Sequence, residues 1–189
     1  MDTLRTMNVW LGAIENAILQ FAVVALALIM GIVSIDVAMR YIFNRPFAWS
    51  YDFVSIYLMA FLFFLALART YAVNGHVSVD LLHHFVGNKG RRVLYLVITL
   101  VSATLFALIT YASATRAISQ YVENDIVTGD YAWPLWIAGA MVPIGCGLLV
   151  LRLCFDAVCH LMTLVTGVEI VPLPATAGSG PIAEQASFE

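Results

Sequence analysis

Four long apolar runs divide the chain, and polar segments separate them. The runs span residues 17–38, 53–73, 93–113 and 133–154. Each has about the 20 residues that a helix needs to cross a bilayer core about 30 Å thick. Because peptide groups find no water in that core, a spanning run must form its hydrogen bonds internally, as a helix does. The pattern therefore predicts an all-α integral membrane protein with four transmembrane helices in a bundle.

The segments outside these runs predict shorter elements. Apolar residues recur at helical spacing before the first run, at Leu4, Met7, Leu11, Ile14 and Ile18. This spacing favours a short interfacial helix, although a simple extension of the first span fits it equally well. The 74–92 connection contains a similar amphipathic pattern. We expect one membrane domain, residues 1–171, followed by a disordered cytoplasmic tail, residues 172–189, which contains Pro and Gly but no apolar periodicity.

Composition supports the membrane assignment and excludes other classes. Of 189 residues, 62% are hydrophobic and 11% are charged, whereas a soluble domain carries about 25% charged residues. The formal net charge of -3 leaves no surplus of cations to bind a phosphate backbone, which excludes nucleic acid as a partner. Lys and Arg are more frequent on the side of the membrane that holds the termini and the 74–92 connection. The positive-inside rule therefore predicts that both termini are cytoplasmic.

Charged residues gather at the ends of the runs. Asp36 and Arg40 are four residues apart, as are Arg152 and Asp156, so each pair lies on one face of a helix. The members of each pair either satisfy each other or contact a partner protein. Proton relays and ion pathways usually place an ionisable group near the bilayer centre. None of the four runs has an ionisable residue near its centre, which disfavours an autonomous ion-coupled transporter.

The histidines suggest a metal or haem site, but their positions disfavour both. His76, Asp80 and His84 follow one another at intervals of four. Two histidines and a carboxylate can bind zinc, yet an interfacial amphipathic helix explains the spacing better. Haem held between spans needs histidines within the helices, whereas His160 follows the fourth run. With no nucleophile–base pair or phosphate-binding loop in the sequence, we expect neither a cofactor nor an enzymatic activity.

Two ordered sets of residues indicate a family. The first contains Arg40, Tyr41, Phe43, Asn44, Arg45, Pro46, Trp49, Asp52, Arg69, His76, Val79, Asp80 and Leu81. The second contains Pro134, Trp136, Pro143, Gly145 and Arg152. Together they resemble the small membrane subunit, or Q-type subunit, of tripartite ATP-independent periplasmic (TRAP) transporters. The chain departs from that pattern at Tyr51 and Asp52, where paired glutamates are common, and at Ala66, where glycine is common.

The resemblance implies a role in the uptake of organic anions across a bacterial inner membrane. In such transporters a periplasmic binding protein delivers the substrate, and a large multi-span subunit carries it together with sodium. The small subunit braces the large one and helps to dock the binding protein. The resemblance thus implies that sodium coupling belongs to the partner. It also implies subunit contact or bundle anchoring for Arg40, Trp49, Asp52, Arg69, His76, Asp80, Trp136 and Arg152. An autonomous small exporter and a membrane-anchor subunit of a redox complex remain alternatives.

Overall fold

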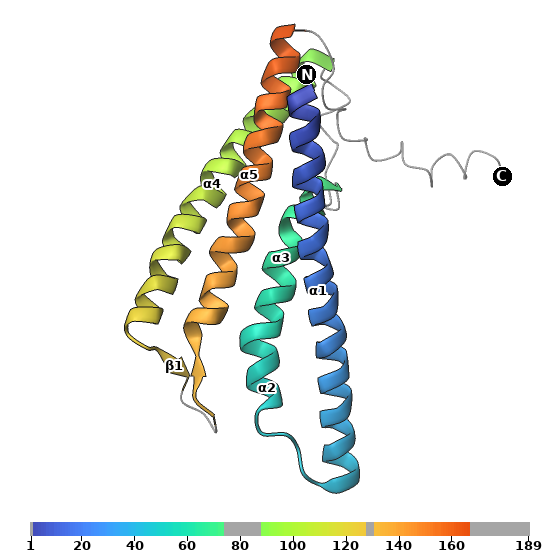
Figure 1. Cartoon of the computed structure of the whole chain (residues 1–189), viewed down its shortest axis with the longest axis vertical. Coiled ribbons are helices and arrows are strands. Elements are labelled where there is room, and N and C mark those ends of the chain that lie inside the picture. The colour runs from blue at the N-terminus through green and yellow to red at the C-terminus, as the bar shows by residue number, and fades with distance from the viewer. Residues whose placement is uncertain (1, 74–87, 128–130, 167–189) are drawn as a thin grey trace, which may run out of the picture.

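The computed structural model describes residues 2–73, 88–127 and 131–166, and helices dominate it (Figure 1). In chain order the elements are α1 (Asp2–Phe43), α2 (Ser50–Phe53), a π-helical segment η1 (Val54–Leu58), α3 (Met59–Ala72), α4 (Asn88–Val122), β1 (Ile126–Val127), β2 (Trp133–Pro134) and α5 (Leu135–Thr166). α2, η1 and α3 follow one another without a break and form the second span. β1 and β2 pair as a short antiparallel ribbon.

Within the described residues, four helical segments are long and apolar enough to cross a membrane. They are Thr6–Phe43, Ser50–Ala72, Arg92–Val122 and Leu135–Leu164. The all-α fold with four candidate spans is therefore confirmed. Three of the helices extend well beyond the apolar runs of the sequence, because hydropathy marks only the part of a helix that suits the hydrocarbon core, and the backbone hydrogen bonds continue past it.

The longer helices decide one open alternative and overturn one expectation. α1 runs without a break from Asp2, so the N-terminal residues extend the first span and do not form a separate helix. α5 runs to Thr166, so His160 lies within the last helix and not beyond it. Residues 88–92 of the second proposed interfacial helix form the start of α4. The rest of that connection and the 172–189 tail lie outside the described residues.

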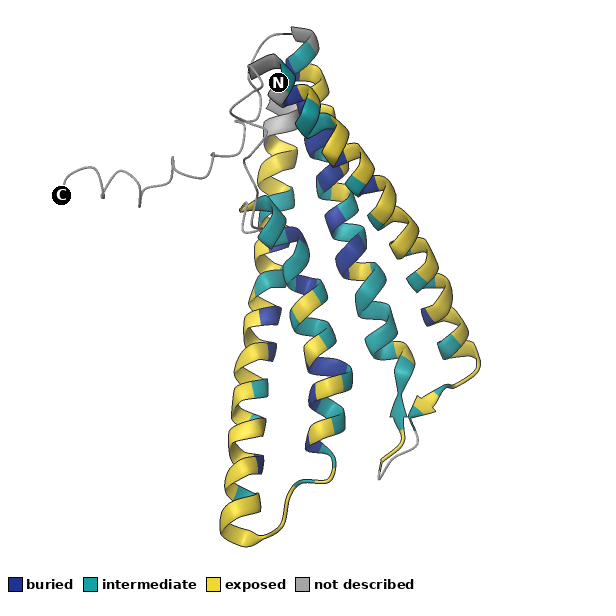
Figure 2. Cartoon of the chain, turned by 180° about the vertical axis from the view of Figure 1, so that it is seen from behind, coloured by how far each residue is buried: buried dark blue, intermediate teal, exposed yellow. Residues whose placement is uncertain are grey.

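The four spans form an open row. α1 packs against the second span, the second span packs against α5, and α5 packs against α4. Among the described residues, α1 makes few backbone contacts with α5 or α4. Figures 1 and 2 show that the α4–α5 hairpin diverges from α1 and α3 toward one end. We name this the loop end, where α1 ends and α5 begins, and we name the opposite end, where α1 begins, the terminal end.

Small cores hold the neighbouring helices of the row together. One contains Ala25, Val54 and Leu58, between α1 and η1. Another contains Ala68, Ala103, Leu149 and Leu153, between α3, α4 and α5. Much of the remaining apolar surface faces outward, above all on α1 and α4 (Figure 2). This is the expected distribution for helices in lipid, because lipid tails are as apolar as leucine side chains.

Candidate subunit-contact site

At the loop end, a carboxylate fixes the turn that follows α1. Asn44, with a φ of 53°, ends the helix in the left-handed conformation common after helix C-termini. The Asp36 side chain then reaches the turn: its Oδ1 accepts a hydrogen bond from the Phe47 backbone N–H at 2.8 Å. Its Oδ2 pairs with the Arg40 guanidinium at 3.0 Å, so the pair expected from the spacing is present. Because the Arg40 side chain is 61% exposed, it remains accessible to a partner.

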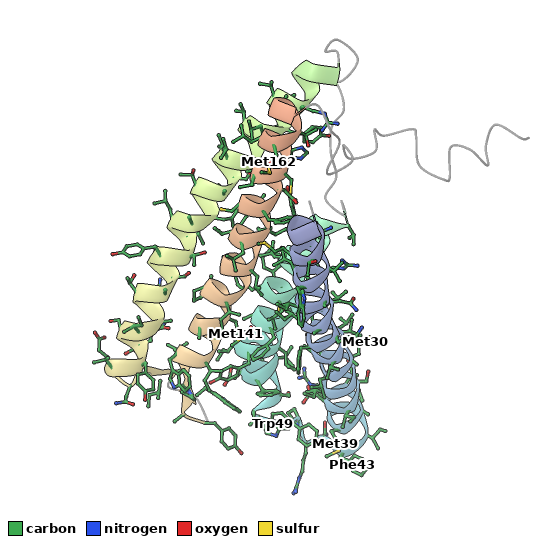
Figure 3. All side chains as sticks on the ribbon, turned by 45° about the horizontal axis from the view of Figure 1, so that its top comes forward. Met30, Met39, Phe43, Trp49, Met141 and Met162 are labelled. Atoms are coloured by element: carbon green, nitrogen blue, oxygen red, sulfur yellow. The ribbon has the colours of Figure 1, made fainter. Side chains whose placement is uncertain are left out.

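Aromatic side chains join the two connections at the loop end. Ring centroids 5.7–6.0 Å apart link Phe47, Trp49, Phe53, Tyr57 and Trp133 in series. Figure 3 shows Trp49, Phe43 and Met39 at the loop end. The Tyr57 hydroxyl donates a hydrogen bond to the Pro134 carbonyl at 2.7 Å. The start of the second span therefore ties the turn after α1 to the ribbon that precedes α5.

Two other residues expected to make subunit contacts, Asp52 and Trp136, also lie at the loop end but outside this aromatic series. Asp52 is half-buried in α2, and no hydrogen bond or ion pair of its carboxylate is found among the described residues. Trp136, in the first turn of α5, is 38% exposed and packs edge-on against Tyr121 of α4, with ring centroids 5.4 Å apart. Arg40, Trp49, Asp52 and Trp136 thus share one end of the molecule without forming one cluster.

At the terminal end, ionisable side chains of α1 and α5 meet. Arg152 donates a hydrogen bond to the Asn8 side-chain oxygen at 3.0 Å. Its guanidinium also lies 3.7 Å from Glu15 Oε1 and 3.5 Å from Asp156 Oδ2, which confirms the expected Arg152–Asp156 pair. Glu15 is only 1% exposed. We name Asn8, Glu15, Arg152 and Asp156 the terminal cluster; it joins two helices that otherwise share few contacts.

Side chains of α3 and α4 surround the terminal cluster. Tyr71 of α3 interacts with the Asp156 carboxylate. His160, one turn beyond Asp156, is 5% exposed and stacks on the Tyr95 ring of α4, with centroids 6.3 Å apart and planes at 17°. All four spans therefore converge at the terminal cluster.

Two more of the residues expected to make subunit contacts, Arg152 and Arg69, lie at the terminal end. Arg152 forms the centre of the terminal cluster. Arg69, near the end of α3, lies within electrostatic range of Glu15. The other two candidates, His76 and Asp80, lie outside the described residues.

Sequence reasoning missed Glu15 because this residue precedes the first apolar run. The spacing of residues along α1 could nevertheless have predicted that Glu15 is buried. Glu15, Ala22, Ile29 and Asp36 are each seven residues apart, and a seven-residue repeat keeps side chains near one face of a helix. That face is the one that the fold buries: Glu15, Ala22 and Asp36 are buried and Ile29 is half-buried. Extending the repeat one step back from the apolar run would have identified Glu15.

The middle of the spans contains no group suited to carrying charge. Residues 16–35, 53–68, 93–115 and 131–151 include no Asp, Glu, Lys, Arg or His. In the part of the chain that the structure describes, no three His, Cys, Asp or Glu side chains are arranged to hold a metal ion. Polar contacts that join different elements lie instead at the two ends, where Arg152 meets Asn8 and Glu15 and Tyr57 meets Pro134.

Comparison with known proteins identifies a family model that matches most of the chain. A family model described as "Tripartite ATP-independent periplasmic transporters, DctQ component" matches residues 29–163. The match covers well over half of the chain, from within α1 nearly to the end of α5. No curated protein matches the chain significantly.

Proposed function

The chain belongs to the DctQ family, the small membrane component of TRAP transporters, and from that premise we propose that it braces a large transport subunit during organic-anion uptake. The family is one of transporter components and not of enzymes. In this proposal the complex lies in a bacterial inner membrane, and the large multi-span subunit carries the anion together with sodium. A periplasmic protein delivers the anion to the loop end, and both termini are cytoplasmic.

The charge-free middle of all four spans is the observation that best supports a bracing role. A protein that moved an anion and sodium by itself would need polar or ionisable groups at mid-depth, and residues 16–35, 53–68, 93–115 and 131–151 supply no charged side chain. The open row also leaves broad apolar faces on α1 and α4. Such faces suit contact with the helices of a larger membrane subunit, through close packing.

Reconstitution into proteoliposomes tests which subunits are needed for transport. Proteoliposomes would contain this chain alone, the large subunit alone, or both, each with and without the binding protein and an inward sodium gradient. We expect sodium-dependent uptake of the labelled anion only when both membrane subunits and the binding protein are present. Transport by this chain alone would favour the autonomous exporter. A haem absorption band in the purified protein would favour the redox anchor.

Arg40 and Asp52 are the loop-end residues for which we propose a subunit contact. Arg40→Ala or Asp52→Asn should lower cellular uptake and reduce the amount of large subunit that co-purifies with the tagged chain. The matched control is Arg116→Ala, because Arg116 is an exposed arginine on α4. Normal uptake and co-purification in both loop-end variants, as in the control, would show that neither Arg40 nor Asp52 contacts the large subunit.

A further inference from the structure

We draw no further inference here: the strongest candidate, the terminal cluster where α1 meets α5, belongs to the site already described, and the buried carboxylate oxygens of Glu15 offer no surface that a ligand could reach.

Discussion

At the scale of single residues, two buried carboxylates on α1 each connect the helix to another part of the chain. Asp36 binds the turn that follows α1, and Glu15 lies against Arg152 of α5. They occupy the same face of the helix, three heptads apart. Burying a charge is unfavourable unless a partner compensates for it, so each carboxylate favours the one geometry in which its partner is in place.

Replacing Glu15 tests the terminal cluster. Glu15→Gln should lower the free energy of unfolding by about 1–3 kcal/mol, because it removes a charge partner from the buried Arg152 guanidinium. Thermal unfolding of the purified chain in detergent measures the change. The control is Glu123→Gln: Glu123 is exposed just after the end of α4, and the one side-chain hydrogen bond found for it among the described residues is with Ser119, so we expect a change within about 0.5 kcal/mol. Equal effects of the two variants would show that the Glu15–Arg152 contact is unimportant.

Replacing Asp36 tests the turn after α1. Asp36→Ala removes the acceptor for the Phe47 N–H, so hydrogen exchange at that amide should accelerate roughly tenfold or more. Asp36→Asn keeps an acceptor oxygen and should preserve most of the protection, although it loses the ion pair with Arg40. Exchange measured by mass spectrometry resolves the difference. Similar exchange in wild type and Asp36→Ala would contradict the role of the carboxylate.

At the scale of elements, close approach of backbones decides which helices are neighbours. A Cβ atom added at Gly145 of α5 would fall 2.6 Å from the carbonyl carbon of Phe64 in α3. That neighbour is backbone and cannot rotate away. Glycine at this position therefore permits α3 and α5 to pack, in agreement with the general use of small residues between membrane helices.

A pair of glycine substitutions tests this contact. Gly145→Ala should destabilise the fold by about 1–3 kcal/mol, the usual cost of overpacking. Gly147→Ala should be neutral or stabilise by up to about 1 kcal/mol, because its Cβ would lie 3.7 Å from a Thr110 methyl group and alanine favours helix. Detergent melting curves compare the two. An unchanged melting temperature for Gly145→Ala would mean that α3 and α5 can move apart to accommodate the added methyl group.

At the scale of the whole molecule, the row is held by contacts at both ends and along α3 and α5, while the hairpins diverge toward the loop end (Figure 1). The terminal cluster joins α1 to α5, and the Tyr57–Pro134 hydrogen bond joins the second span to the ribbon. The row does not bury all of its apolar surface within itself, and in the proposed complex this surface faces lipid or the large subunit.

Tyr57→Phe should loosen the loop end without unfolding the chain. It removes one hydrogen bond worth about 0.5–1.5 kcal/mol and retains the aromatic ring. Double electron–electron resonance measures the distance between spin labels at positions 41 and 121, in a chain with the exposed Cys154 replaced by Ser. We expect a broader distance distribution for Tyr57→Phe than for the chain with Tyr57. Tyr111→Phe is the control, because Tyr111 is exposed on α4. Identical distributions for Tyr57→Phe and wild type would show that this bond does not restrain the hairpins.

The sequence by itself determined the four spans, the charge-free middle and the family, because each depends on the order of residue types along the chain. It also placed Asp36 beside Arg40 and Arg152 beside Asp156, since helical spacing fixes residues four apart. The true helix ends, the π-helical segment and the approach at Gly145 depend on neighbouring helices, so only the tertiary structure decided them. The same holds for the contact of Glu15 with Arg152, because their proximity arises when helices distant in sequence pack together.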